Sequence, residues 1–582
     1  ISLLAIPQRT AAAEVHDHPL LPSVRYQAAV GELPADALAL PWPALAATDA
    51  APAIVGRYAR ELGAAVPGRV VASAKSWLSH AGVDRSAPIL PWGAPEGPGG
   101  VAKISPQLAS ASYLAHVRAA WDAQHPTAPL AQQRVVLTVP ASFDEGARAL
   151  TLEAAQLAGL PEVHLLEEPK AAFHDWLVLQ GAQVGTALQG SQQVLVVDVG
   201  GGTTDLTLIR VDAPEAPGGL PVLTRTGVGE HLMLGGDNMD LALAHLLEPQ
   251  LSGEGQRLPP ARFAQLVQRC RVAKEQLLAA DAPESVAVTL LGAGSKLLAQ
   301  TRSATLTREQ VAQCIVEGFL PHTAITELPR RRQNALTGLG LPYPAEAAIT
   351  RHLAAFLAQQ GAQPDTVLLN GGVFHAPALV ERLVAILSGW RGAPVSVLHN
   401  PHPDYAVARG AAAHGLARWQ AEFELNQAIA QSAPASAATN KIASLPTIGG
   451  GAPRSYLLVL PTAAGAAPQA VCLLARGTPE GTRVVLSGRR FALRLGQAVG
   501  FALVATSQHR DLLPGQIVPL EGDGFVALPP LSAVLPRPEG SRQSQVDVLL
   551  HTTMTEVGTL QVRCVAVDDA AQEWALAFAT RG

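Results

Sequence analysis

This chain of 582 residues has little charge, few aromatic side chains and few cysteines. Charged residues make up 15% of it and the formal net charge is −5, which argues against a surface that binds nucleic acid. Its four cysteines are far apart and form no C-x-x-C pair, so we expect neither a zinc site nor a disulfide framework. A reducing, cytoplasmic compartment fits this cysteine usage best. The cysteines are Cys270, Cys314, Cys472 and Cys564.

Long apolar runs are also missing, so we expect no membrane partner. The opening Ile1-Ser-Leu-Leu-Ala-Ile has no basic region before it and reaches Pro7 too early for a signal peptide. It also lacks an initiator methionine, which leaves a processed chain or a fragment open. Apolar residues still make up 48% of the chain, enough for several domains with large cores.

The sequence changes character along its length. Residues 1–415 alternate apolar strand runs with amphipathic helical stretches, which predicts an α/β architecture with a strand at Val135–Val139 and a helix from about 144 to 157. From about residue 446 the pattern is one of short strands with turns, which predicts a β-sandwich. An alanine- and serine-rich stretch between the two is typical of a linker. The predicted units are an α/β domain at 1–420, a linker at 421–445 and a β-rich domain at 446–582.

The most specific local pattern lies at residues 194–209, where three glycines separate two apolar strands. Asp198 ends the first strand, and Thr203, Thr204 and Asp205 begin the second. Glycines let backbone N–H groups approach a ligand, and two carboxylates can hold a divalent cation directly or through water. The stretch therefore predicts a loop for phosphate and magnesium, although the glycines alone would also suit a plain hairpin turn.

Two better-known phosphate motifs do not fit this stretch. The chain has no G-x-x-x-x-G-K-[ST], which excludes the lysine-containing P-loop. A strand follows the glycines where a dinucleotide-binding fingerprint requires a helix. Taken alone, Glu168 at a strand end would be a helix cap and Lys75 a solvated side chain.

The order of the motifs along the chain favours a functional site over a helix cap at Glu168 and a solvated side chain at Lys75. Ala-Lys75-x-x-Leu, Val-Pro140-Ala-x-Phe and Glu168-Pro-x-Ala-Ala precede the glycine hairpin. Gly-Gly-x-x-x-Asp240, an Asn-Gly-Gly loop and a closing Asn-Pro segment with Asp404 follow it. The set resembles the ATPase domain of the heat-shock protein 70 (DnaK-type) chaperone family over about residues 20–415. Sugar kinases share the hairpin but not the ordered set.

This resemblance implies an actin-like (ribonuclease-H-like), two-lobed ATPase domain followed by a β-rich substrate-binding domain. It implies ATP or ADP with Mg²⁺ as cofactors. Lys75 and Glu168 would orient the attacking water, Asp198 and Asp205 would hold the water shell of magnesium, and the Thr203 hydroxyl would lie near the transferred phosphoryl group. The other implied nucleotide contacts are Gly200, Gly201, Gly202, Thr204, Gly235, Gly236, Lys274, Gly371, Gly372, His375 and Asp404.

The chain departs from the family pattern at several places. Arg271 and Glu275 exchange the signs of the charges that flank Lys274 in the family, and His375 replaces an arginine. The linker lacks the leucine-rich acidic signature of the family. The family's first strand, with its Asp-Leu-Gly-Thr-Thr phosphate loop, would lie before Ile1. The resemblance also assigns Pro140 and Arg148 to coupling with the β-rich domain.

The resemblance implies a chaperone for protein folding that couples ATP turnover to binding of unfolded or extended polypeptide. Its implied partners include a J-domain co-chaperone and a nucleotide-exchange factor. ATP hydrolysis is expected if the intact protein carries the first phosphate loop. The alternative is a relative of the same fold that binds nucleotide without hydrolysing it and acts as a regulator or scaffold.

Overall fold

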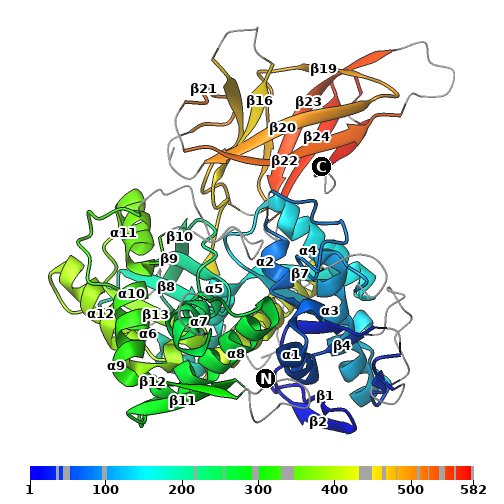
Figure 1. The fold of residues 1–582 in the computed structure, drawn as a ribbon. Helices are drawn as coiled ribbons and strands as arrows, with labels where there is room; N and C mark the ends of the chain where they lie inside the picture. The colour runs from blue at the N-terminus through cyan, green and yellow to red at the C-terminus, as the bar shows by residue number, and fades with distance from the viewer. Residues whose placement is uncertain are drawn as a thin grey trace.

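In the computed structural model of the protein, a β-rich part lies above two α/β parts (Figure 1). The structure describes the whole chain except residues 30, 35–37, 43–52, 81, 95–100, 215–218, 253–255, 291–300, 330–345, 431–447, 462–466, 480, 507–511, 522–523, 537–543, 556–558, 570 and 579–582. None of the helices in the described ranges is both long and apolar enough to cross a membrane.

The first α/β part, residues 1–190, contains three small sheets with helices beside them (Figure 1). One is the antiparallel pair β1–β2, one has the order β4-β3-β5, and one is the parallel pair β6–β7. The strand predicted at Val135–Val139 and the helix predicted at 144–157 are confirmed. The elements are β1 (Ile6–Ala11), β2 (Glu14–His18), β3 (Val24–Gln27), β4 (Ala53–Val55), α1 (Arg57–Ala65), β5 (Val70–Ala72), α2 (Ala74–Trp77), α3 (Pro106–Gln124), β6 (Val135–Val139), α4 (Glu145–Leu157), β7 (Val163–Glu167), α5 (Glu168–Gln180) and α6 (Val184–Ala187).

The second α/β part is built on a six-stranded sheet with the order β14-β13-β8-β9-β10-β15. Strand β8 lies at its centre, antiparallel to β9 and parallel to β13. The first part differs: among its described residues β1 and β6 belong to separate two-stranded sheets, and no central strand joins them as β8 joins β9 and β13. The elements are β8 (Gln193–Val199), β9 (Thr204–Asp212), β10 (Val222–Val228), α7 (Gly236–Ser252), α8 (Pro260–Leu277), β11 (Ser285–Leu290), β12 (Arg302–Thr307), α9 (Arg308–Val311), a π-helical turn (Ala312–Val316), α10 (Glu317–Phe319), α11 (Ile349–Gln360), β13 (Thr366–Asn370), the 3-10 helix η8 (Gly372–His375), α12 (Pro377–Arg391), β14 (Ser396–Leu398) and α13 (Pro403–Ala430).

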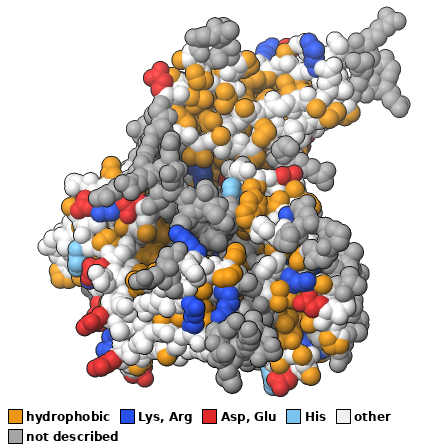
Figure 2. Space-filling model, viewed as in Figure 1, with side chains coloured by type: hydrophobic (Ala, Val, Ile, Leu, Met, Phe, Trp, Pro, Cys, Tyr) orange, Lys and Arg blue, Asp and Glu red, His pale blue; other side chains and the backbone are white. Residues whose placement is uncertain are grey.

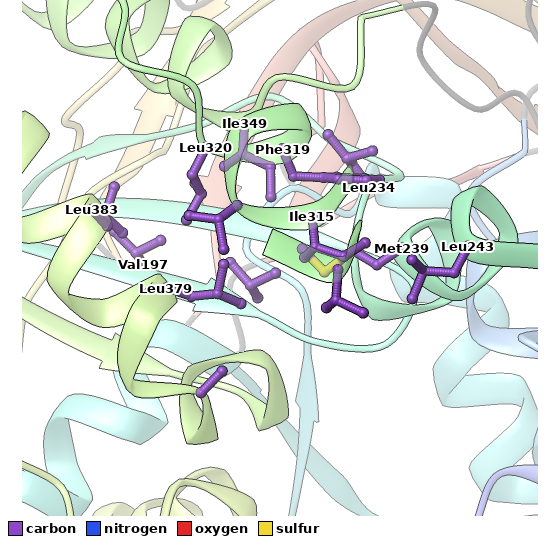
Figure 3. Packing of buried hydrophobic residues seen from close by; sticks show 14 of the residues in the cluster. Val197, Leu234, Met239, Leu243, Ile315, Phe319, Leu320, Ile349, Leu379 and Leu383 are labelled. Atoms are coloured by element: carbon purple, nitrogen blue, oxygen red, sulfur yellow. The ribbon is translucent and has the colours of Figure 1, made fainter. Parts of the chain in front are cut away.

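Helices cover both faces of this second sheet, which is why β8 and β13 are almost entirely apolar. On one face Val197 packs against Leu379 and Leu383 of α12 and belongs to the same cluster as Met239 of α7 (Figure 3). On the other face α5 packs with Phe173, Trp176 and Leu177 against β8 and β13. Helix α5 also contacts β6 and β7, so its first residue, Glu168, lies where the two α/β parts meet.

The β-rich part forms one path of strands, β18-β23-β24-β25-β22-β20-β16-β17-β21, with β19 paired to β23. A single buried cluster draws residues from both halves of this path, among them Leu458, Leu503, Val548 and Val562. The short strands predicted for this region are confirmed. The elements are β15 (Ile448–Gly449), β16 (Ser455–Leu460), β17 (Gln469–Leu474), β18 (Arg483–Val485), β19 (Phe491–Arg494), β20 (Ala498–Thr506), β21 (Ile517–Pro519), β22 (Val526–Val534), β23 (Gln545–Met554), β24 (Leu560–Ala566) and β25 (Glu573–Phe578).

The junction between the two regions differs from the predicted linker at 421–445. Helix α13 continues to Ala430, because alanine, leucine, glutamate and glutamine at 421–430 are good helix formers. Residues 431–445 of the predicted linker lie outside the described residues. After them β15 pairs in parallel with β10, with Ile448 opposite Leu223. The first described residues of the C-terminal region therefore form an edge of the α/β sheet.

Candidate active site

The glycine hairpin is the centre of the candidate site. It joins β8 to β9 and places Asp198 directly opposite Asp205. The turn is closed by the Gly200 amide, which donates to the carbonyl of Thr203 at 2.9 Å. The Gly200 carbonyl in turn accepts from the amide of Gly236 at 3.0 Å, so the start of α7 is held against the hairpin.

Gly235 serves this contact between chain segments. A Cβ atom there would lie 2.6 Å from the Gly200 carbonyl oxygen and 2.7 Å from that of Gly201, closer than any side chain can approach. Gly371 is constrained in the same way, with a φ of +92° and a Cβ position only 2.2 Å from the Val199 carbonyl oxygen. Glycine at these two positions lets three loops meet at the end of β8.

A cleft of about 700 Å³ opens in front of the hairpin, and the predicted catalytic residues line it. Lys75 follows β5, and its Nζ lies 2.5 Å from the Oε1 of Glu168 at the start of α5. Asp198, Asp205 and Gly200–Thr203 line the same cleft. Helix α1 and helix α8 face each other across it (Figure 1). The structure thus brings Lys75, Glu168 and both hairpin carboxylates together.

This end of the cleft carries more negative than positive charge. Burial, the neighbouring Glu168 and Asp205 together raise the pKa of Asp198 to about 7. Burial also raises the pKa of Asp205. Although burial opposes the charge on Lys75, Glu168 and the two aspartates raise its pKa, so Lys75 stays a cation. Three carboxylates therefore share one ammonium group in the ligand-free protein.

These residues fit a magnesium ion that a nucleotide brings with it. Oxygen donors are the ligands that Mg²⁺ prefers, and it commonly keeps several waters while binding one or two carboxylates and the phosphates of a substrate. In the described part of the chain, no three His, Cys, Asp or Glu side chains converge as a complete metal cage. The buried Oδ1 of Asn370 has no hydrogen-bond partner in the described structure, while its Nδ2 donates to Asp198 at 3.1 Å. The Asn370 amide thus holds one carboxylate oxygen of Asp198 in place.

The two threonines of the hairpin have different environments. Thr203 lines the cleft, as predicted for a residue near the transferred group. Thr204 is completely buried, and its hydroxyl donates to the Leu234 carbonyl at 2.7 Å. Thr204 was predicted as a nucleotide contact, but the described structure uses it to hold the segment before α7.

The predicted nucleoside contacts lie together around a second cavity of about 460 Å³. Gly236, Lys274, Gly372, His375 and Asp404 line it. Their polar side chains contact partners within the protein: the Lys274 Nζ lies 2.7 Å from Asp240, and the His375 Nε2 lies 3.0 Å from Asp404.

The two residues with exchanged signs also form a pair. The Arg271 Nε lies 3.3 Å from Glu275, one helical turn away on α8, and the Arg271 guanidinium lies 3.8 Å from Asp237. Neither Asp237 nor this pairing was predicted as part of the site. Asp237 directly follows Gly235 and Gly236 in the sequence, and this neighbourhood could have identified it as a site residue.

The residues assigned to coupling lie under the β-rich part. Arg148 is 2% exposed and donates to Glu167 at 3.1 Å, and Glu167 also pairs with Arg225. On α4, the carboxylate of Glu145 accepts from the Tyr456 hydroxyl at 2.7 Å and from the Leu560 amide at 3.2 Å. Buried contacts of this kind connect the end of the α/β cleft to the β-rich part.

Comparison with known proteins agrees with this arrangement. Residues 96–323 match the family model described as Hsp70 protein. A chaperone protein HscA homolog from Acidithiobacillus ferrooxidans is 32% identical over 252 residues, which is 42% of this chain and 37% of the relative. HscA homologs from Acinetobacter baylyi and Acinetobacter baumannii are 37% identical over 142 and 149 residues, covering 24% and 26% of this chain and 21% and 22% of those relatives. Over residues 96–323 the chain is therefore similar to the Hsp70 family.

The part of the chain that the family model matches holds the hairpin, Glu168 and Lys274. Lys75, the Gly371–Gly372 loop, His375 and Asp404 lie outside it. Their assignment rests on the order of the motifs and on the geometry of the two cavities. The first relative is matched over only 37% of its own length.

Proposed function

We propose that this protein is a chaperone-type ATPase with an actin-like, two-lobed nucleotide-binding domain. The observation that carries the proposal is the meeting of Lys75 and Glu168, from the first α/β part, with Asp198 and Asp205 of the hairpin in the second. Phosphoryl transfer depends mainly on positioning and on neutralising charge, and this cleft supplies groups for both.

The proposed roles follow from where the side chains lie. Glu168 accepts a hydrogen bond from the attacking water, and Lys75 at 2.5 Å fixes the direction of that carboxylate. Asp198 and Asp205 hold the waters around Mg²⁺, which when bound neutralises phosphate charge. Gly201, Gly202 and Thr203 offer backbone amides and one hydroxyl to the phosphates. Around the nucleoside lie Gly236, Lys274, Gly372, His375 and Asp404.

We further propose that the β-rich part, which we take to be a sandwich, binds unfolded or extended polypeptide. Figure 2 shows hydrophobic side chains spread over its visible face. The exposed large hydrophobic residues of this part include Val485, Leu513, Ile517, Val526 and Val534. A J-domain co-chaperone and a nucleotide-exchange factor are proposed as partners from the family. The four cysteines are all free, in keeping with the proposed cytoplasmic location.

ATP turnover by the purified protein and by Glu168→Gln tests the enzymatic proposal. Because Glu168 directs the water, the variant should lose turnover by about 100-fold or more while it still binds MgADP. Glu162→Gln, at an exposed position before β7, is the matched control. Binding of MgADP with equal, background turnover in all three proteins would instead support the non-hydrolysing relative.

A second measurement tests coupling to the β-rich part. Tyr456→Phe removes the hydroxyl that Glu145 accepts from, whereas Tyr113→Phe removes a buried hydroxyl with no partner in the described structure. We expect ATP to accelerate release of a fluorescent extended peptide from the unaltered protein and from Tyr113→Phe, and much less from Tyr456→Phe. An ATP effect of the same size in all three would contradict this route of coupling.

A further inference from the structure

A line of hydrogen bonds runs behind Asp205, on the side away from the cleft. The Ser142 Oγ lies 2.8 Å from the Oδ1 of Asp205 and also 2.8 Å from the Nδ1 of His231. The Nε2 of His231 lies 2.8 Å from the Oγ of Ser79. The Ser142 amide adds a longer contact of 3.4 Å to the same Asp205 oxygen. None of these three side chains was predicted as functional.

The three side chains come from separate segments that meet at this point. Ser142 lies between β6 and α4, His231 lies between β10 and α7, and Ser79 follows α2. Ser142 is 6% exposed and Asp205 3%, so water does not compete for these bonds. Phe143 packs edge-on against the His231 ring, with centroids 5.9 Å apart. Burial lowers the pKa of His231 to about 4, so the ring is neutral and carries one N–H.

Which group donates in each of these hydrogen bonds follows from the end of the line at Asp205. An ionised Asp205 can only accept, so the single Ser142 hydroxyl proton goes to it. The Ser142 oxygen is then an acceptor for His231, which places the ring proton on Nδ1. The Nε2 of His231 then carries no proton, and the single Ser79 hydroxyl proton lies between two acceptors, this Nε2 and the Ser76 carbonyl, each 2.8 Å from the Ser79 Oγ.

We propose that Ser142 and His231 are positioning residues that hold the Oδ1 of Asp205 away from the cleft and thereby leave its Oδ2 to orient the water shell of the nucleotide-bound cation. This inference rests on the proposed nucleotide-binding function. Partners behind the groups that hold a metal commonly change metal affinity by about 10- to 100-fold when they are removed. Ser142 acts directly on Asp205, and His231 acts through Ser142.

The tautomer of His231 tests the network without any nucleotide. Nitrogen NMR of histidine-labelled protein should show a neutral ring protonated on Nδ1, assigned by its disappearance in His231→Asn. Ser142→Ala should move that proton to Nε2, where Ser79 can accept it, and Ser142→Thr should restore the Nδ1 form. An Nε2-protonated ring in the unaltered protein, or no change in Ser142→Ala, would overturn the proposed line of donors.

The magnesium dependence of nucleotide binding tests the consequence. In Ser142→Ala, we expect the Mg²⁺ concentration for half-maximal tightening of ADP binding to rise about tenfold, with ADP affinity in EDTA unchanged. Ser142→Thr keeps the hydroxyl, and His231→Asn keeps a donor in the Nδ1 position, so both should have a Mg²⁺ midpoint close to that of the unaltered protein. His231→Leu keeps no donor and should show most of the tenfold rise. Ser110→Ala, which removes a hydroxyl bonded only within α3, is the control.

The outcomes separate this inference from the proposed function. If the unaltered protein binds no nucleotide, the proposed function fails, and the tautomer experiment still decides the hydrogen-bond network. If it binds MgADP and Ser142→Ala keeps the same Mg²⁺ midpoint, the positioning role is refuted while the proposed function stands.

Discussion

The two ends of the cleft treat charge in opposite ways. At the phosphate end, Asp198, Asp205 and Glu168 share the single cation of Lys75, and the pKa of Asp198 is raised to about 7. At the nucleoside end, these polar groups already have partners within the protein: Lys274 pairs with Asp240, and the His375 ring lies within hydrogen-bond distance of Asp404. One end is electrostatically incomplete without a ligand, and the other is complete.

This difference indicates where binding energy would come from. A cation and a polyphosphate would relieve the excess of carboxylate at the first end, because opposite charges in a desolvated cleft interact strongly. A nucleoside at the second end would have to share groups that already bind each other. We therefore expect phosphate and magnesium to dominate affinity, and the identity of the base to matter less.

Lys75→Met should have the largest effect. It removes the cation that Glu168, Asp198 and Asp205 share, so the direction of Glu168 and the charge balance around the phosphates are both lost. We expect ATP turnover to fall by about 100-fold or more, with ADP affinity changed only a few-fold. Steady-state turnover and calorimetric ADP titration measure the two quantities. Lys103→Met, away from both cavities, is the control. Normal turnover in Lys75→Met would show that Lys75 takes no part in the mechanism.

Lys274→Met tests whether the Lys274–Asp240 pair at the nucleoside end stabilises the folded protein. The variant leaves the buried Asp240 without its ion pair, which costs about 3 kcal/mol at pH 8. Burial already raises the pKa of Asp240 to about 6, and loss of the lysine raises it further. Asp240 would therefore take up a proton as the pH falls, so urea midpoints should show a smaller loss at pH 5 than at pH 8. A loss independent of pH would mean that the pair is not what Lys274 provides.

The phosphate end could be predicted from the sequence because its chemistry is local. The hairpin lies within eight consecutive residues, 198–205, and the strand pattern around it fixes which residues face each other. Lys75 and Glu168 needed the order of motifs along the chain, because nothing local distinguishes them from a surface lysine and a helix cap.

The remaining parts of the site depend on which loops meet, and a strand pattern does not contain that information. Ser142 and His231 are 89 residues apart. Ser142 fills the variable position of the Val-Pro140-Ala-x-Phe motif, and His231 belongs to a segment without a motif of its own. Thr204 has the residue type of a phosphate contact, yet the alternation along β9 turns it inward. The end of α13 was missed because its last ten residues favour a helix as much as a linker.

Asp198→Asn should make the ligand-free protein more stable, because it removes a buried carboxylate that is unfavourable to ionise. A raised pKa means that the folded protein holds this proton up to about pH 7, whereas an unfolded aspartate releases it near pH 4. The associated stability is full below pH 4 and is lost as the pH rises to 7. Asparagine avoids that loss, so we expect the ligand-free variant to be more stable by on the order of 2 kcal/mol at pH 8 and not at pH 4.

Thermal unfolding with and without MgADP measures both consequences of Asp198→Asn. The variant should gain stability on its own and lose most of the further stabilisation that MgADP gives the unaltered protein. Asp212→Asn, at the half-exposed end of β9, is the control. A variant that is less stable than the unaltered protein at pH 8 would mean that Asp198 is satisfied in the ligand-free protein, which would remove the contrast between the two ends.

His375→Ala should have the smallest effect. The His375 side chain is 54% exposed, and its pair with Asp404 faces solvent, where such pairs contribute about 1 kcal/mol or less. We expect ADP affinity to change by roughly threefold, and the preference for ADP over GDP to change by no more than that. Competition titrations with the two nucleotides measure this, with His16→Ala on β2 as the exposed control. A loss of tenfold or more, specific to ADP, would show that His375 contacts the base and that the nucleoside end contributes to recognition as strongly as the phosphate end.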